Sequence, residues 1–408
     1  MGDYNKFKKM NLILLGTIVL ALCLPVAQGF VPSAFQSGLD RSSFALSVSK
    51  EENAVQDGSS NDSRRGFVKK VVGGLAVTGI VANGIAVQGP SPVALPPGSL
   101  KGQVIVITGG NTGLGLESAK RLAAAGATIV ITSRNIAKGT RAVQIIQEYV
   151  KSQNGDNDSK IYAAPLDLCD LESVKAFPTA LKQILPPGSN IDVLMNNAGV
   201  MAIPELEITK DGLEKTFQTN HLGHFALTAL MMPLLSHGAK VINVASAAHM
   251  IVARTGLDMD NLNGEKGYAP WTAYGMSKLE NILFTQELQR RADAAGIKLT
   301  ATSLHPGAVR TDLPRYIVGE DKFGSMLDDA PPTSFNPALY LGLYFTKNVQ
   351  RGANSQIWLA AGANGEDVKG KYFQNLKEVK LLSFAKDSEK AKQLWDISEK
   401  LSGIKFNV

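Results

Sequence analysis

The fold is decided by residues 104–115, which read VIVITGGNTGLG. The four apolar residues at the start are typical of a strand buried on both faces of a parallel sheet. The glycines that follow predict a tight turn, and the Ala- and Leu-rich segment 117–125 predicts a helix after it. Glycines let a backbone approach a pyrophosphate, and a helix N-terminus offers it N–H donors. The stretch therefore predicts a dinucleotide site, with contacts from Thr108, Gly109, Asn111, Thr112, Gly113, Leu114 and Gly115.

A second strand, expected at 128–132, ends in Ser133 and Arg134. In NAD-binding sheets, an acidic residue at this point bonds the 2′-hydroxyl of the ribose. No carboxylate stands here, whereas an Arg pairs well with the 2′-phosphate of NADP and Ser133 leaves room for it. The alternative is a solvated Arg at a strand end. The pattern favours NADPH/NADP+ over NADH.

Two further apolar strands, expected at 164–168 and 191–199, end in small or polar residues. Asp167 is placed to accept a hydrogen bond from the adenine amino group, and the run 196–199 (NNAG) lets the backbone pass close to the adenosine ribose. Asp192, at the start of its strand, is interpreted as structural. The cofactor contacts expected from these strand ends are Asp167, Leu168, Asn197, Ala198 and Gly199.

Tyr274 and Lys278 are four residues apart and therefore share one face of a helix. An unperturbed Tyr titrates near pH ~10 and is a poor acid–base group at neutral pH. A fixed cation beside it lowers the pKa of the phenol and makes the hydroxyl useful for proton transfer to a carbonyl. Such a pair alone is usually a surface pair, but here it follows the motifs above.

The order of these motifs, from TGxxxGxG through NNAG to YxxxK and a Pro-Gly turn, resembles the short-chain dehydrogenase/reductase family over about residues 100–375. The resemblance implies a Rossmann-type α/β fold: a single doubly wound parallel sheet between two layers of helices. It also implies contacts to the nicotinamide end of the cofactor from Tyr274, Lys278, Pro306, Gly307, Val309 and Thr311.

The same resemblance implies a catalytic tetrad of Asn220, Ser246, Tyr274 and Lys278. Tyr274 would exchange a proton with the carbonyl oxygen while hydride moves to or from the nicotinamide, and Ser246 would hydrogen-bond the same oxygen. Lys278 would bind the nicotinamide ribose and lower the pKa of Tyr274. Asn220 would hold a water that links Lys278 to solvent.

The spacing of 274 − 246 = 28 residues between Ser246 and Tyr274 resembles the branch of retinol dehydrogenases, protochlorophyllide reductases and the WW-domain oxidoreductase. Protochlorophyllide reductases carry a functional cysteine near the substrate, and the one cysteine beyond the presequence here, Cys169, follows the adenine-side Asp167. That activity is therefore disfavoured. The segment 312–345, rich in Pro, Leu, Phe and Tyr, predicts a flap over an apolar substrate of retinoid, carotenoid or pigment type. The alternative is an ordinary pair of helices packed on the sheet.

The histidines and the C-terminal segment are interpreted as structural. His221, His224 and His249 are expected to be core or rim residues, because no His, Cys, Asp or Glu group has metal-ligand spacing. A last strand is expected at 370–373 and a closing amphipathic helix at about 391–401. Family analogy implies a homodimer formed through the helices after Asn220 and Tyr274.

The first hundred residues resemble targeting signals in series. Residues 1–29 form a signal peptide pattern, with an anchor helix as the weaker alternative, and the Ser-rich segment 30–62 resembles transit segments of algae with complex plastids. Residues 63–97 begin with SRRGFVKK, a twin-arginine-like signal, and continue as either an export signal or a membrane-attached segment. These features predict a plastid location, in the stroma, at the thylakoid membrane or in its lumen, with the ER as the alternative.

Residues 98–408 are expected to form one domain. The formal net charge of +6 is spread over the chain and gives no case for nucleic-acid binding. The sequence predicts an NADPH-dependent oxidoreductase that interconverts a carbonyl and an alcohol on an apolar small molecule. The alternatives are an NADPH-sensing role, resembling the dehydrogenase of the chloroplast import translocon, and a general reductase of small carbonyls.

Overall fold

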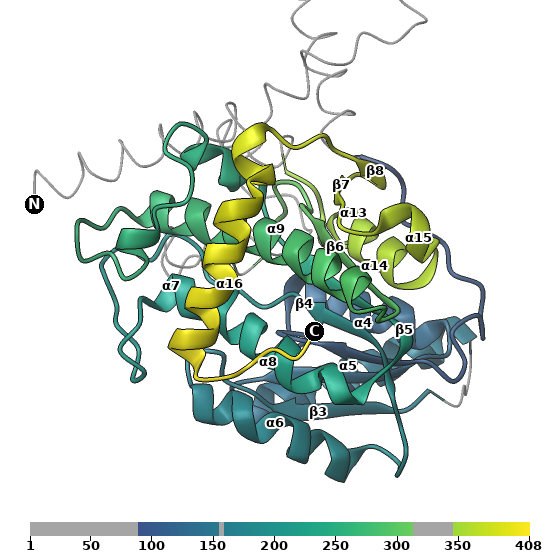
Figure 1. Cartoon of the computed structure of the whole chain (residues 1–408). Coiled ribbons are helices and arrows are strands. Elements are labelled where there is room, and N and C mark those ends of the chain that lie inside the picture. Colours follow the sequence, from purple (N-terminus) through teal and green to yellow (C-terminus); the bar gives the residue numbers. More distant parts are fainter. Residues whose placement is uncertain (1–88, 155–158, 312, 314–345) are drawn as a thin grey trace, which may run out of the picture. The chain divides into compact units, whose positions relative to one another are not determined.

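In a computed structural model, an eight-stranded sheet in the order β3-β2-β1-β4-β5-β6-β7-β8 forms the centre of the chain (Figure 1). All neighbouring strands pair in parallel except β7 and β8. The order reverses beside β1, which makes the sheet doubly wound, as predicted. The strands are β1 Val104–Ile107, β2 Thr128–Ser133, β3 Ile161–Pro165, β4 Ile191–Asn196, β5 Leu235–Val244, β6 Leu299–Leu304, β7 Tyr372–Gln374 and β8 Lys377–Glu378.

The structure describes residues 89–154, 159–311, 313 and 346–408. The segments interpreted as targeting signals, up to residue 88, and the expected flap, apart from residue 313, lie outside these ranges. The described residues from Pro90 onward belong to one compact unit. Within the described ranges, no helix combines the length and the apolar character that a membrane span requires.

Helices cover both faces of the sheet (Figure 1). Alternate residues of β1 point into two different cores, because successive side chains of a strand point to opposite faces. Val106 packs with residues of α6, α8 and α9, whereas Ile105 and Ile107 pack with residues of α4, α5 and α14. The α-helices are α4 Gly113–Ala124, α5 Ile136–Asn154, α6 Leu171–Ile184, α7 Lys215–Phe217, α8 Gly223–Met231, α9 Pro270–Ala294, α13 Val349–Gly352, α14 Asn354–Ala361, α15 Gly365–Val368 and α16 Ser388–Ser402.

Several expected boundaries are wrong. Strand β4 ends at Asn196, not at residue 199, and the last expected strand, 370–373, lies at Tyr372–Gln374. Helix α4 begins at Gly113, four residues before the expected segment 117–125, so the last two glycines of the turn belong to the helix. Strand β3 ends at Pro165 and does not extend over 164–168, which places Asp167 in the loop beyond it. A π-helical turn, Gln218–Leu222, and four 3₁₀ turns complete the described elements; the 3₁₀ turns are Met232–Leu234, Ala247–Val252, Met259–Asn261 and Ser383–Lys386.

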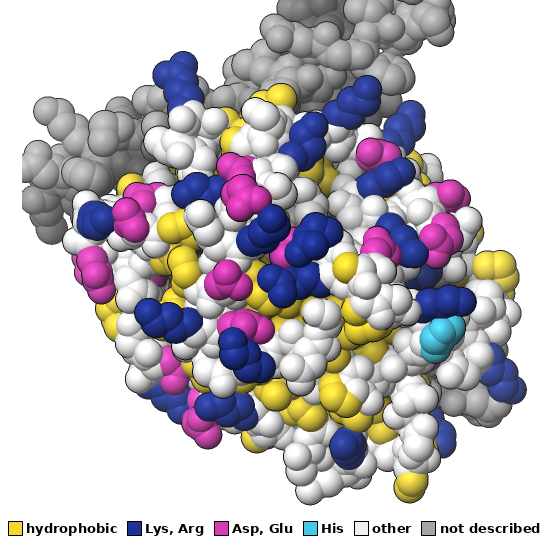
Figure 2. All heavy atoms as spheres, viewed as in Figure 1, with side chains coloured by type: hydrophobic (Ala, Val, Ile, Leu, Met, Phe, Trp, Pro, Cys, Tyr) yellow, Lys and Arg dark blue, Asp and Glu magenta, His cyan; other side chains and the backbone are white. Residues whose placement is uncertain are grey.

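The closing helix α16 packs across α8 and α9. The ring of its Trp395 lies 5.1 Å from that of Phe225 on α8 and 6.0 Å from that of Phe284 on α9, measured between centroids. The guanidinium of Arg291 lies 4.4 Å from the centre of the Trp395 ring. The ring of Phe406 stacks on that of Trp395 at 4.6 Å and meets that of Phe225 edge-on at 5.3 Å. Around this helix, Figure 2 shows Lys and Arg interspersed with Asp and Glu on the visible face.

Residues 90–93, which we call the N-terminal strap, are bound to the domain by the buried side chains of Asn354 and Arg121. Asn354 donates from Nδ2 to the carbonyls of Pro90 and Ser91, at 3.0 and 2.8 Å, and accepts from the Val93 N–H at 3.0 Å. Arg121 of α4 donates to the carbonyl of Val93 and, at 3.2 Å, to Asn354 Oδ1. The strap is therefore part of the folded unit.

Candidate active site

The glycine-rich turn after β1 is packed so closely that side chains cannot replace its hydrogens. A Cβ on Gly115 would lie 2.5 Å from the carbonyl oxygen of Gly109 and 2.6 Å from Asn197 Nδ2, and a Cβ on Gly110 would lie 2.5 Å from the Ile131 side chain. Gly109 and Gly113 have φ of +62° and +54°, a left-handed region that favours glycine. The turn thus presents bare backbone at the carboxyl end of β1.

Helix α4 starts at this turn and has the character of an anion site. Its first turn holds no acidic residue, and its N-cap residue, Thr112, makes no side-chain cap hydrogen bond to the helix. The N–H groups and the positive end of the helix dipole therefore point to where a pyrophosphate would lie. The turn and helix fit a dinucleotide as the sequence predicts.

The residues expected at the adenosine end also come together. Arg134 is exposed just beyond β2, and its positive charge acts on the Cys169 thiol, which follows β3. Ser133 Oγ donates to the backbone of Asn135 at 2.9 Å, and Asp167 Oδ1 accepts from the Cys169 N–H at 2.9 Å. The ends of β2 and β3 therefore place a cation and a carboxylate in one region, where the 2′-phosphate and the adenine are expected.

Thr108 joins the turn to the run after β4. Its hydroxyl oxygen accepts from the N–H groups of Asn197 and Ala198, at 2.9 and 3.0 Å. The side chain of Asn197 donates back to the Thr108 carbonyl at 2.8 Å. The two backbone segments expected to contact the cofactor are therefore held in a fixed relation.

The two hydroxyls and the lysine that are expected to be catalytic converge from β5 and α9. Ser246 lies two residues beyond β5, and its Oγ accepts from the Ala248 N–H at 3.1 Å. Tyr274 is buried in α9 and hydrogen-bonds Ser246. Lys278 Nζ lies 5.5 Å from the centre of the Tyr274 ring and donates to the Val244 carbonyl at 3.0 Å.

Asn220 lies in a π-helical turn, Gln218–Leu222, a distortion common at functional sites. Its Oδ1 accepts from the Val200 N–H at 2.8 Å, and its Nδ2 donates to the Val200 carbonyl and to Ser277 Oγ, both at 2.9 Å. The side chain thus bridges the loop after β4 to α9, beside Lys278. The role in holding a water, which the family resemblance implies for Asn220, stays a prediction.

In the protein without bound cofactor, burial shifts the pKa values of Tyr274 and Lys278. Burial raises the pKa of Tyr274 to about 12, although the hydrogen bond from Ser246 acts in the opposite direction. Burial also lowers the pKa of Lys278 to about 8. The expected lowering of the Tyr274 pKa is therefore wrong for the protein alone. At neutral pH the phenol keeps its proton, which suits donation to a carbonyl oxygen.

The Pro306–Gly307 turn rests on a lysine that the sequence did not single out. Lys347 is buried, and its Nζ donates to the Pro306 carbonyl at 2.9 Å and to Asn375 Oδ1 at 2.5 Å. Gly307 has φ of +97°, and a Cβ there would lie 2.8 Å from Lys347 Cε. Burial lowers the pKa of Lys347 to about 8.

The other residues expected at the nicotinamide end lie close to the glycine-rich turn. A Cβ on Gly113 would lie 3.4 Å from the Thr311 side chain, and a Cβ on Gly352 would lie within 2.9 Å of both Val309 and Leu114. His221, His224 and His249 are buried, as predicted. Among the described residues, no group of His, Cys, Asp or Glu could hold a metal ion.

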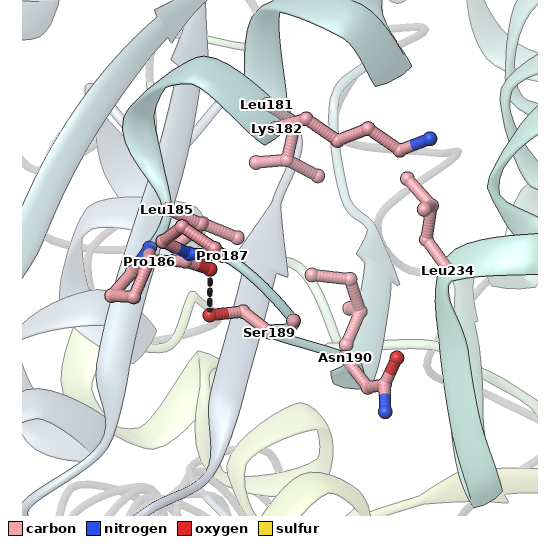
Figure 3. Close-up of a pocket in the computed structure, with 10 residues that line it drawn as sticks. Leu181, Lys182, Leu185, Pro186, Pro187, Ser189, Asn190 and Leu234 are labelled. Atoms are coloured by element: carbon pink, nitrogen blue, oxygen red, sulfur yellow. Dashed lines mark hydrogen bonds between the residues drawn. The ribbon is translucent and has the colours of Figure 1, made fainter.

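A hollow of about 300 Å³ lies away from these residues (Figure 3). It is lined by the end of α6, the loop 186–190, Leu234 and the first residue of β4, Ile191. In Figure 3, Ser189 Oγ donates to the Pro186 carbonyl across one side of it, at 2.7 Å. Because it opens at the amino end of β4 while the catalytic groups follow the carboxyl ends of the strands, it is separate from the site.

Comparisons with known proteins agree with this geometry. Residues 103–321 match the family described as short chain dehydrogenase. Retinol dehydrogenase 14 from Mus musculus is 38% identical over 315 residues, covering 76% of this chain and 88% of the relative. The short-chain dehydrogenase TIC 32 A, chloroplastic, from Brassica napus is 33% identical over 303 residues, covering 72% and 87%. A crystal structure of an uncharacterised protein from Mycobacterium paratuberculosis aligns with a TM-score of 0.58 at 32% identity, covering 78% of this chain and all of that one.

Proposed function

Because the chain belongs to the short-chain dehydrogenase family and is an oxidoreductase of that family, we propose that it interconverts a carbonyl and an alcohol on an apolar substrate with NADPH. The convergence of Ser246, Tyr274 and Lys278 at the carboxyl end of the sheet carries the proposal. The glycine-rich turn and the N-terminus of α4 beside them supply the cofactor site.

In the reduction, bound NADPH supplies the hydride. The Tyr274 hydroxyl donates its proton to the carbonyl oxygen, and the Ser246 hydroxyl donates a hydrogen bond to the same oxygen as negative charge develops on it. Because the pKa of Tyr274 is raised to about 12, the proton is present at the start of the step at neutral pH. Lys278, cationic below its pKa of about 8, binds ribose hydroxyls and faces the phenol.

NADPH is the proposed cofactor because Arg134 is exposed where the 2′-phosphate would lie, close to Asp167 and Cys169. A guanidinium there binds a phosphate with two parallel hydrogen bonds, which the 2′-hydroxyl of NADH cannot reproduce.

An apolar substrate of retinoid, carotenoid or pigment type is supported by the identity to retinol dehydrogenases. A plastid location is supported by the chloroplastic relative and by the targeting-like segments 1–29, 30–62 and 63–97. The same relative supports a second candidate function, an NADPH-responsive component of a plastid membrane complex.

The test is NADPH oxidation by the purified full-length protein against retinal, apocarotenals, xanthophyll ketones and short aldehydes. Turnover of one apolar class that disappears in Tyr274→Phe supports the proposal. Turnover of short aldehydes alone indicates a general carbonyl reductase. Tight NADPH binding without turnover of any carbonyl favours the NADPH-responsive role.

A further inference from the structure

Both ring nitrogens of His224 are hydrogen-bonded to parts of the site. Nε2 lies 2.9 Å from Thr108 Oγ1, on the turn after β1, and Nδ1 lies 3.1 Å from the backbone carbonyl of Asn220, in the π-helical turn. The side chain is buried, with 2% of the residue exposed. His224 thus stands between the cofactor-binding turn and the catalytic asparagine.

The donors around Thr108 determine which nitrogen carries the proton. The Thr108 hydroxyl oxygen already accepts from the N–H groups of Asn197 and Ala198, so its single hydrogen must be donated. The nearest acceptors are His224 Nε2 at 2.9 Å and the Met195 carbonyl at 3.4 Å. The shorter contact makes Nε2 the acceptor. The ring proton then lies on Nδ1 and is donated to the Asn220 carbonyl.

A protonated ring does not fit this arrangement, because an imidazolium would have to donate from both nitrogens. Burial and the positive charge of Lys278 act in the same direction and lower the pKa of His224 to about 4. The ring is therefore neutral at neutral pH, with one donor and one acceptor pointing in fixed directions.

We propose that His224 is a positioning residue that fixes the cofactor-binding turn after β1 relative to the π-helical turn that carries Asn220. On one side it orients Thr108, which holds the Asn197–Ala198 backbone. On the other it orients Asn220, whose amide reaches Ser277 next to Lys278. The expected effect on turnover rests on the proposed function.

His221 provides a matched control. It is equally buried and lies three residues earlier, but its Nε2 bonds Ser398 Oγ on α16 at 3.0 Å, and its ring packs among Phe217, Phe225 and Phe284. It reaches neither the turn nor Asn220. Replacing His221 therefore reports the cost of losing a buried histidine as such.

The two amide variants of His224 separate the two contacts. In His224→Asn the amide can stand where Nδ1 stands, so the bond to Asn220 is kept and the bond to Thr108 is lost. In His224→Gln the amide reaches the Nε2 position, so the bond to Thr108 is kept and the bond to Asn220 is lost. We expect His224→Asn to raise the Kd and KM for NADPH about tenfold with kcat within about twofold, the effect of one buried hydrogen bond. We expect His224→Gln to lower kcat about tenfold with Kd within about twofold.

Two measurements do not depend on turnover. The Kd for NADPH is measured by fluorescence quenching. The tautomer of His224 is measured by ¹⁵N NMR of the protein labelled at its five histidines. A proton on Nδ1 of His224 and the split between the variants support the inference. A proton on Nε2 overturns it. So do changes in Kd and kcat that are the same in both His224 variants and in the control variant His221→Gln. If no carbonyl is turned over, the proposed function fails, while the tautomer and the Kd of His224→Asn still decide the role of His224.

Discussion

The ammonium group of Lys278 donates a hydrogen bond to the backbone carbonyl of Val244, 3.0 Å away, and so joins α9 to the end of the strand that leads to Ser246. Asn281 donates to the same carbonyl at 3.2 Å. No carboxylate partner is recorded for Lys278 in the described part of the chain, so burial dominates and lowers the pKa of Lys278 to about 8. The protonation of this group therefore changes within an ordinary assay range.

The first prediction concerns pH. Lys278 is cationic below its folded-state pKa and neutral above it, so kcat/KM for NADPH should fall as pH rises above about 8, approaching tenfold per pH unit. This ratio is the right quantity because it reports groups of the free enzyme. Lys347 also has a pKa of about 8, so Lys347→Met is the control. If kcat/KM still falls above about pH 8 in Lys347→Met, the fall is assigned to Lys278. If the fall disappears in that variant, it is assigned to Lys347, and the prediction is wrong.

The second prediction concerns cofactor choice. Arg134→Ala should raise the KM for NADPH about 10- to 100-fold, the effect of losing hydrogen bonds to a charged group, and leave the KM for NADH unchanged. Lys138→Ala removes a nearby exposed cation of α5 and should change neither value. Equal effects of Arg134→Ala on both cofactors would contradict recognition of the 2′-phosphate.

The third prediction concerns the glycine-rich turn. Gly115→Ala should abolish measurable NADPH binding and lower the free energy of unfolding by about 1–3 kcal/mol, because the new Cβ meets the Gly109 carbonyl and Asn197. Gly188→Ala is the control: its φ is +79° but nothing lies within 4 Å, so it should incur backbone strain and leave NADPH binding intact. Normal binding by Gly115→Ala would show that the turn can relax.

The features around the candidate site whose local structure the sequence predicted correctly are those in which neighbouring residues share one element or lie in consecutive elements. The strand, turn and helix at 104–124 and the Tyr274–Lys278 pair are of this kind. The contacts that it missed join distant positions: His224 bonds Thr108 across 116 residues, and Lys347 bonds Pro306 across 41. The pKa of Tyr274 was predicted in the wrong direction because the extent of its burial depends on the whole fold.

The fourth prediction concerns association. A homodimer through α8 and α9 was expected by analogy, but α16 packs on these helices through Trp395. We therefore expect the protein to be monomeric at micromolar concentration in light scattering coupled to size exclusion. Trp395→Ala should lower the free energy of unfolding by about 3–5 kcal/mol. A dimer crosslinked between cysteines placed on α8 and α9 would contradict this prediction.

The fifth prediction concerns the N-terminal strap. Asn354→Ala removes three hydrogen bonds to the strap and should lower the free energy of unfolding by about 2–4 kcal/mol. Removing residues 1–97 should have a similar effect, whereas removing residues 1–88 keeps the strap and should leave the melting temperature unchanged. Equal melting temperatures for the two truncated proteins would show that the strap adds no stability.

The strap also sets an order of events during synthesis. Val93 bonds Asn354 across 261 residues, so the strap cannot dock until α14 has left the ribosome. Long-range contacts of this kind form late, after the cost of closing the intervening loop has been met. The segment ahead of residue 90, which the sequence predicts to carry targeting signals, therefore leaves the ribosome before the strap is bound to the domain. Docking of the strap therefore belongs to the late steps of folding, when most of the chain has been made.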